Sequence, residues 1–182
     1  MRWRVAESKL LVRTPVFSLR QDRKRRLSEE DRSHDFFILE SVDWVNVVPI
    51  TAAGEVVLIE LYRHGIDGVS LEIPGGMIDP EDPDPAAAAA REMREETGYE
   101  ADRLEPLGVV HPNPAIQGNY CHSFLARDVR QVGKPVQHGN EETEVVRVPL
   151  TRIREMIAGG EIMHALTITA FSFFQFYNSV RR

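Results

Sequence analysis

Short β-rich runs and stretches of helical character alternate along the chain. Alternating or continuous apolar residues predict strands at 9–20 (one or two short strands), 36–40, 44–50, 55–62, 70–74, 104–110, 122–126 and 144–148. The turn residues at 51–54 indicate that the third and fourth of these runs form a hairpin. Helices are predicted at 85–97, 151–158 and 165–177. The order is mixed α and β, with strands on either side of one central helix.

The central helix has clear boundary signals. Asp84 is a favourable N-cap, and Pro85 suits the first helical position. The alanines Ala86–Ala90 follow, and Gly98 favours the left-handed conformation that ends a helix. We therefore expect one helix that begins at Pro85 and ends at Thr97.

The composition suits one globular domain with at most a small N-terminal appendage. The chain has 182 residues, 42% of them hydrophobic, which is enough for a sizeable core. The formal net charge is −6, from 22 basic and 28 acidic side chains. Sequence-independent nucleic-acid binding needs Lys and Arg to neutralise phosphates, so we expect no nucleic-acid partner.

Cysteine usage and hydropathy favour a cytoplasmic protein. Cys121 is the single cysteine, which excludes a disulfide framework within the chain. No apolar signal-peptide core follows Met1–Arg4. The most apolar tract, 165–177, is too short to span a bilayer and carries Thr, Ser and Gln. We therefore expect no membrane partner and interpret this tract as a buried helix.

A basic run, Arg23–Arg26, lies within the polar stretch 20–32. Such a run is typical of a solvated loop. A local basic cluster could also bind a small phosphorylated ligand, and the sequence leaves both interpretations open.

Three carboxylates occur on one face of the central helix. Glu92, Glu95 and Glu96 stand at i, i+3 and i+4, where like charges repel. Mg²⁺ is typically bound by a few carboxylates together with substrate phosphates, so a metal site would explain the arrangement. The alternative is an ordinary solvent-facing acidic face, partly neutralised by Arg91 and Arg94.

Residues 91–99 read Arg-Glu-Met-Arg-Glu-Glu-Thr-Gly-Tyr. They resemble the second half of the Nudix box, G-x5-E-x7-R-E-U-x-E-E-x-G-U, where U is bulky and apolar. Gly76 fits the leading glycine, but Asp82 replaces the first glutamate, and eight residues rather than seven separate it from Arg91. In the family this first acid often pairs with the arginine, so we expect Asp82 to do the same from a longer loop.

The resemblance implies an α+β fold, an α/β/α sandwich around a mixed β-sheet. It also implies that Glu92, Glu95, Glu96 and the backbone carbonyl near Gly75 hold Mg²⁺, or alternatively Mn²⁺, while Arg91 orients the catalytic machinery. Such metal ions offset the charge of a diphosphate and activate a bound water for attack on phosphorus. A nearby carboxylate would assist as general base.

Segments outside the box resemble the ADP-ribose pyrophosphatase branch of the family. Residues 62–65 and 71–76 are similar to the branch pattern Q-Y-R-x-G…L-E-x-P-A-G, with Leu61 in place of the glutamine. The resemblance implies that Arg63 contacts a phosphate, for which its planar fork is suited, and that Glu72 belongs to the substrate site. The alternative for Arg63 is an arginine on a strand edge that faces water.

Two later segments support the same branch. Pro114, sixteen residues beyond Gly98, is a marker of ADP-ribose hydrolases, although it could instead set a turn. Residues 141–146 resemble an acidic loop that supplies the catalytic base or a further metal ligand. Glu144 matches that role best and Glu142 next, and the alternative is an ordinary charged loop.

Residues 1–42 resemble a small N-terminal β subdomain through which such enzymes form homodimers, which leaves 43–182 as the Nudix domain. In such dimers aromatic and arginine side chains approach the nucleotide. Trp44, Phe17 and Arg23 are candidates for these contacts, and a core role is the alternative for Trp44.

Three functions are compatible with these patterns. The favoured one is a diphosphatase that converts ADP-ribose to AMP and ribose 5-phosphate. The second is the same chemistry on another nucleotide sugar or a dinucleotide. The third is a non-catalytic module that senses ADP-ribose-like ligands.

Overall fold

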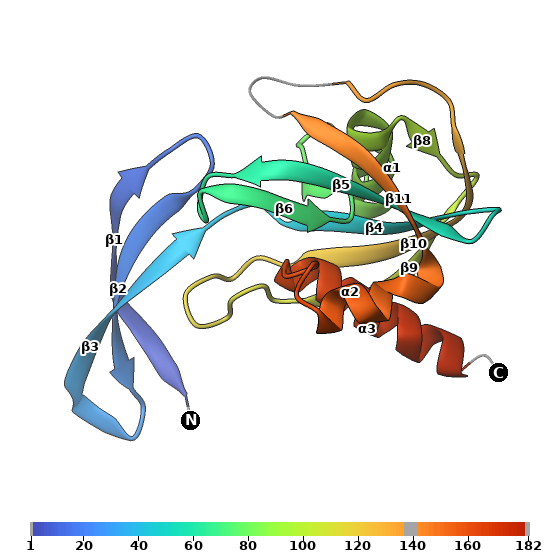
Figure 1. Cartoon of the computed structure of the whole chain (residues 1–182). Coiled ribbons are helices and arrows are strands. Elements are labelled where there is room, and N and C mark those ends of the chain that lie inside the picture. Colours follow the sequence, from blue (N-terminus) through green and yellow to red (C-terminus); the bar gives the residue numbers. More distant parts are fainter. Residues whose placement is uncertain (1, 137–141, 181–182) are drawn as a thin grey trace. The chain divides into compact units, whose positions relative to one another are not determined.

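The computed structural model describes residues 2–136 and 142–180, which belong to two compact units. The first unit contains Met1–Asp43 and His111–Tyr120, and the second contains Trp44–Val110 and Cys121–Arg182. Figure 1 shows both units, with elements labelled by their number in chain order where there is room. The predicted division between residues 42 and 43 did not include the returning segment 111–120.

The first unit is built on an antiparallel sheet in the order β1–β2–β3. Its strands are β1 (Trp3–Arg13), β2 (Ser18–Arg26) and β3 (Glu29–Glu40). The loop interpretation of residues 20–32 is therefore wrong for most of that stretch, because β2 runs through the basic residues. Arg23 donates to Asp35 on β3 and lies 4.0 Å from Glu7 on β1. Acidic cross-strand partners thus stabilise a highly charged central strand.

The segment His111–Tyr120 joins the first unit through hydrogen bonds to β3 and to the residues that follow it. The N–H of Leu39 donates to the carbonyl of Ile116 at 2.8 Å. The side-chain amide of Asn119 donates to the carbonyl of Val42 at 3.2 Å. These contacts join segments far apart in sequence, and no local pattern predicts them.

The second unit is a mixed sheet in the order β11–β5–β4–β10–β8, in which β6 pairs with β5, β7 with β4 and β9 with β10. Its strands are β4 (Trp44–Thr51), β5 (Glu55–Arg63), β6 (Gly68–Glu72), β7 (Gly75–Met77), β8 (Tyr99–Glu100), β9 (Leu104–Val110), β10 (Cys121–Gln131) and β11 (Thr143–Pro149). β4 and β10 run parallel, and the other pairs run antiparallel. The predicted strands of this unit are present, while the short β7 and β8 were not predicted.

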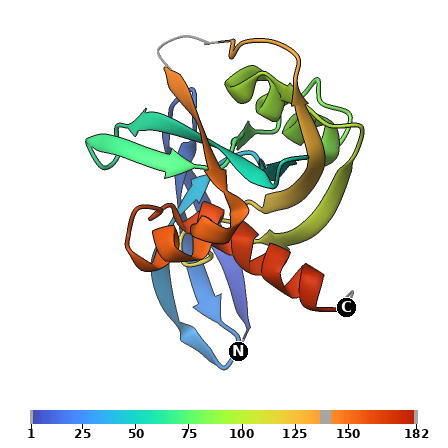
Figure 2. The same cartoon turned by 45° about the vertical axis from the view of Figure 1, so that its right-hand side comes forward.

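Helices cover both faces of this sheet, as Figures 1 and 2 show. They are α1 (Pro85–Thr97), α2 (Ile153–Ala158), which follows the 3-10 turn η1 (Leu150–Arg152), and α3 (Ala165–Val180). α1 packs Ala88, Ala89 and Met93 against one face. α2 and α3 pack Met156 and Phe171 against the other. The predicted α/β/α sandwich is confirmed.

The predicted caps of α1 are confirmed. The side chain of Asp84 accepts a hydrogen bond from the N–H of Ala87 at 2.9 Å, and Pro85 occupies the first helical position. Gly98 has φ 72° and donates its N–H to the carbonyl of Arg94 at 2.8 Å. The helix therefore ends where a residue without a Cβ lets the chain turn.

The helix predicted at 165–177 is present as α3 and extends to Val180. Thr167 and Ala170 are fully buried, whereas Phe176 is exposed, so only one side of α3 faces the core. Among the helices in the described part of the chain, none is long and apolar enough to cross a membrane.

The segment between β6 and β7 fills a gap between β4 and β5. β4 and β5 pair antiparallel at Ile50 and Val56, next to their predicted turn, and then diverge. β6 continues along β5 and β7 along β4, and the N–H of Val47 donates to the carbonyl of Pro74 at 2.9 Å. Residues 72–76, which include this connection and the adjoining ends of β6 and β7, are called the inserted segment below. The inserted segment lies in the middle of the sheet beside α1.

Candidate active site

Two carboxylates of α1 lie directly against the backbone of β7. The N–H of Gly75 donates to Glu96 Oε2 at 2.8 Å. A Cβ atom on Gly76 would lie 2.6 Å from Glu92 Oε1, closer than real Cβ contacts allow. The paired glycines therefore let the acidic face of α1 approach the inserted segment.

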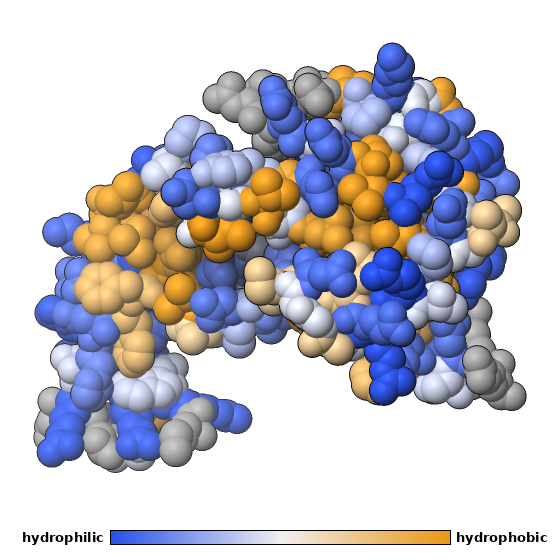
Figure 3. Space-filling view, viewed as in Figure 1, coloured by the Kyte–Doolittle hydropathy of each residue, from blue (hydrophilic) through white to orange (hydrophobic). Residues whose placement is uncertain are grey.

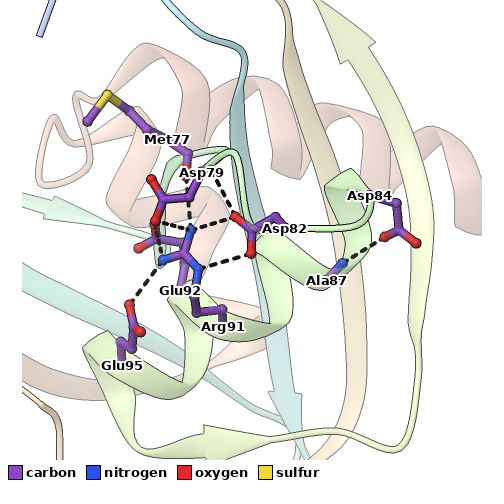
Figure 4. Close-up of polar contacts among 8 residues, drawn as sticks. All are labelled: Met77, Asp79, Asp82, Asp84, Ala87, Arg91, Glu92 and Glu95. Atoms are coloured by element: carbon purple, nitrogen blue, oxygen red, sulfur yellow. Dashed lines mark hydrogen bonds and ion pairs between the residues drawn. The ribbon is translucent and has the colours of Figure 1, made fainter.

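The guanidinium of Arg91 holds this region together (Figure 4). Its Nη1 donates to Glu92 Oε1 at 2.9 Å and to Glu95 Oε2 at 3.1 Å. Its Nε and Nη2 donate to the two oxygens of Asp82 at 3.1 and 2.8 Å, and Nη2 also donates to the carbonyl of Met77 at 3.1 Å. The expected pairing of Asp82 with Arg91 is thus confirmed.

The longer loop of the box is closed by its own hydrogen bonds. The N–H of Asp79 donates to Asp82 Oδ2 at 2.9 Å, and the N–H of Asp82 donates to the carbonyl of Asp79 at 3.0 Å. This turn takes up the additional residue, so Asp82 still reaches the arginine. The substitution and the changed spacing of the box are therefore accommodated locally.

The charges around Arg91 affect one another's pKa values. The hydrogen bond from Arg91 lowers the pKa of Asp82 against the opposing effect of burial, and the same bond raises the pKa of Arg91. For Glu92, burial is the largest influence and raises the pKa, although Arg91 partly opposes it. A desolvated carboxylate of this kind is stabilised by a nearby cation.

Oxygen donors of this type fit a hard divalent cation. Among residues 2–136 and 142–180, however, no three His, Cys, Asp or Glu side chains converge into a group able to hold a metal ion. In the structure Arg91 donates to Glu92 and Glu95, while Glu96 accepts from the N–H of Gly75. A metal would replace these partners, and the ligand roles of Glu92, Glu95, Glu96 and Gly75 stay predictions.

A second cluster lies in the inserted segment itself. Arg63, at the end of β5, donates Nε and Nη2 to the two oxygens of Glu72, each at 2.9 Å. His164 Nδ1 lies 2.9 Å from Glu72 Oε2. Burial alone would raise the pKa of Glu72, but the hydrogen bonds and charges of Arg63 and His164 lower it to about 2. Glu72 thus contacts Arg63 directly. That both residues belong to the substrate site stays a prediction.

His164 cannot be recognised as a functional residue from the sequence, because its spacing to the other histidines is not that of metal ligands. The residue immediately precedes α3, and its contact with Glu72 joins segments far apart in the chain. No local signal identifies such a contact.

The two acidic candidates for the general base differ in position. The hydroxyl of Thr143 donates to the carbonyl of Glu96, and Val145 packs with α1, so these side chains share the face that α1 covers. By strand alternation Glu144 lies on the opposite face, with Val146, which packs in the α2 and α3 core. The structure therefore does not bring Glu144 to the carboxylates of α1. Glu142 is exposed and directly precedes β11.

The other predicted contact residues belong to different parts of the chain. Trp44 begins β4, is half-buried, and pairs with Met77 of β7. Pro114 is an exposed residue in a turn of the first unit. Phe17 and Arg23 belong to the same unit. Their contacts with a substrate stay predictions.

Comparison with known proteins shows what the chain resembles in sequence and in fold. A family model described as the NUDIX domain matches residues 41–166. An ADP-ribose pyrophosphatase of Mycobacterium tuberculosis is 27% identical over 155 residues, which cover 84% of this chain and 73% of that protein. A GDP-mannose pyrophosphatase of Yersinia enterocolitica is 30% identical over 136 residues, covering 70% of each. A crystal structure of an ADP compounds hydrolase, 20% identical, shares the fold with a TM-score of 0.83, covering 100% of this chain and 96% of that one.

Proposed function

The chain belongs to the Nudix family and is a Nudix diphosphatase, and we propose that it hydrolyses ADP-ribose to AMP and ribose 5-phosphate with Mg²⁺. The observation that carries the reaction class is the acidic face of α1 held against Gly75 and Gly76 by Arg91. The choice of substrate is supported by the similarity to an ADP-ribose pyrophosphatase.

Glu92, Glu95 and Glu96 would hold the cation, joined by the carbonyl of Gly75. When bound, Mg²⁺ would offset the charge of the diphosphate and lower the pKa of an attacking water. Arg91 joins α1 to the loop before it through its two hydrogen bonds to Asp82. Its Nη1 also donates to Glu92 and Glu95, which offsets part of their negative charge.

Arg63 supplies positive charge near the substrate phosphates in this proposal. Its guanidinium is 41% exposed, whereas its partner Glu72 is 2% exposed. The carboxylate of Glu72 is therefore buried in the protein interior, whereas a ligand can reach the guanidinium of Arg63. Trp44 and Pro114 are proposed to contact the remainder of the substrate.

Of the two loop glutamates, Glu142 is the better candidate for the general base. The hydrogen bond from Thr143 to the carbonyl of Glu96 fixes the start of β11 against α1, and Glu142 is the preceding residue. Glu144 is directed to the other face of the sheet, so its predicted role needs a rearrangement of β11. A mutation of each glutamate distinguishes the two assignments.

A homodimer formed through the first unit is proposed as well. The three-stranded sheet leaves several large apolar side chains exposed, and Figure 3 shows apolar residues gathered over this unit. They include Trp3, Val5, Leu10, Val12 and Phe37 in the strands, and Phe17 just before β2. Exposed apolar surface of this kind is typical of association sites. Light scattering across a concentration series tests the oligomeric state.

A second substrate has specific support, because the relative that cleaves GDP-mannose is 30% identical. The test is a panel of ADP-ribose, GDP-mannose, NADH, a diadenosine polyphosphate and CoA, with and without Mg²⁺. A coupled phosphatase releases phosphate from monophosphate products but not from intact diphosphate esters; CoA, which carries a 3′-phosphate monoester of its own, is followed by chromatography of its products instead.

Mg²⁺-dependent cleavage with ADP-ribose preferred supports the proposal. Preference for GDP-mannose would keep the reaction and discard the substrate. Binding of ADP-ribose without cleavage of any compound would point instead to a sensor.

A further inference from the structure

The carboxylate of Glu72 is almost completely buried, and Arg63 and His164 lower its pKa against the effect of burial, which keeps it ionised at neutral pH. It accepts from Arg63 Nε and Nη2 and lies 2.9 Å from His164 Nδ1. Burying a charge is costly unless hydrogen-bonded partners compensate, and removing one such partner is strongly destabilising to the arrangement. Glu72 therefore depends on both basic side chains.

The proton on His164 can be assigned from this contact. An ionised carboxylate is only an acceptor, so Nδ1 must carry the hydrogen that it donates to Glu72 Oε2. The same nitrogen lies 3.0 Å from the hydroxyl oxygen of Thr167, which accepts from the N–H of Ile73 at 3.2 Å. The residues around the start of α3 are thereby fixed to the inserted segment at two adjacent points, Glu72 and Ile73.

The geometry of Arg63 follows from that of Glu72. A bidentate pair fixes the plane of the guanidinium as well as its distance. Because Nε and Nη2 face Glu72, the edge that carries Nη1 is turned away from the carboxylate, on a side chain that is 41% exposed. Any group that holds the rotamer of Glu72 also holds the direction in which Arg63 is presented.

We propose that His164 is a positioning residue: its Nδ1–H holds Glu72 so that Arg63 is presented to the substrate diphosphate. This inference rests on the proposed role of Arg63 in phosphate binding. His164 itself does not touch the substrate, and its effect passes through Glu72 to Arg63.

Steady-state kinetics of two His164 variants test the proposal. Loss of a hydrogen bond to a charged group typically changes an equilibrium constant about tenfold or more. His164→Ala should therefore raise KM about tenfold and change kcat much less. His164→Asn should have a KM close to that of the wild type, because the amide N–H of asparagine can take the place of Nδ1–H. Equal KM values for wild type and His164→Ala, or equal behaviour of the Ala and Asn variants, would overturn the proposal.

A double-mutant cycle with Arg63 separates positioning from general packing. If His164 acts through Arg63, then His164→Ala should have no further effect on KM in an Arg63→Ala background. Additive losses in the double variant would mean an independent structural role. Met163→Ala is the matched control, because Met163 is the neighbouring residue and is 74% exposed. It should leave KM and the melting temperature unchanged.

An NMR measurement tests the contact without any substrate. In wild-type protein the ¹⁵N shift of His164 Nδ1 should be that of a protonated nitrogen at neutral pH, and Glu72→Gln should change it. If that shift is observed but ADP-ribose is not cleaved, the contact stands while the proposed substrate fails. A neutral ring protonated only at Nε2 would overturn the inference, whatever the enzyme hydrolyses.

Discussion

Arg91 and Arg63 are both partly exposed arginines held by carboxylates, yet the two regions differ in the number of carboxylates around the arginine. Four carboxylates lie within 3.4 Å of Arg91, those of Asp79, Asp82, Glu92 and Glu95. At the second cluster a single buried carboxylate, that of Glu72, lies between Arg63 and His164. The first region has surplus negative charge and the second does not.

The pKa values follow the same division. Burial raises the pKa of Glu92, because one arginine does not compensate for all the surrounding carboxylates. At Glu72 burial has the same sign, but two basic neighbours outweigh it and lower the pKa to about 2. A surplus of carboxylates suits a cation, and an exposed, firmly oriented arginine suits a phosphate. The two regions are therefore suited to the two charged components of one reaction.

The largest expected effect is the loss of charge at the metal region. Glu96→Gln keeps an oxygen that can accept from the N–H of Gly75 but removes the negative charge. Mutation of even an outer-shell residue of a metal site lowers metal affinity or activity about 10- to 100-fold, so kcat should fall by more than about 100-fold. Melting temperature and kcat measured over a Mg²⁺ titration provide the check. A near-wild-type kcat would remove Glu96 from the metal site.

The second effect concerns stability at acid pH. The pKa of Glu72 is lowered from 4.5 to about 2 in the folded protein, so the unfolded chain binds more protons between these values. The resulting stabilisation, about 3 kcal/mol, is complete above pH 4.5 and is lost as pH falls towards about 2. Urea unfolding of wild type and Glu72→Gln from about pH 6 to pH 3 should give converging stabilities. Parallel curves would show that Glu72 is not the group responsible.

The third effect compares the two acidic residues at the start of β11. If Glu142 is the general base, Glu142→Gln should lower kcat by about 100-fold and change KM little. Glu144→Gln, directed to the opposite face, should retain most of kcat and is the matched control. The reverse result would restore the original preference for Glu144 and would require β11 to rearrange when substrate binds.

The comparison also shows which features a sequence can predict. The ends of α1 depend on residues close together in the chain, Asp84 and Gly98, and were predicted correctly from them. The Asp82–Arg91 pair was expected from the resemblance to the Nudix box, and it is present. β2 was missed because its charged residues find their partners on neighbouring strands, as Arg23 does with Asp35.

His164 was missed for a related reason. Its partner Glu72 lies far away in the chain, and only the insertion of residues 72–76 between β4 and β5 brings the two together. Local signals are present in the sequence itself, whereas such contacts exist only once the sheet has formed.

The smallest expected effect isolates the geometry of Arg63 from its charge. Arg63→Lys keeps the positive charge next to Glu72 but replaces a planar, bidentate group with a point charge. We expect kcat/KM to fall about tenfold, mainly through KM, because one hydrogen bond to a charged partner is lost. Glu96→Gln should instead act mainly on kcat, so the two variants should separate binding of the phosphates from activation of the water. If Arg63→Lys lowered kcat and left KM unchanged, Arg63 would act in the transition state, and the division of labour between the two regions would have to be abandoned.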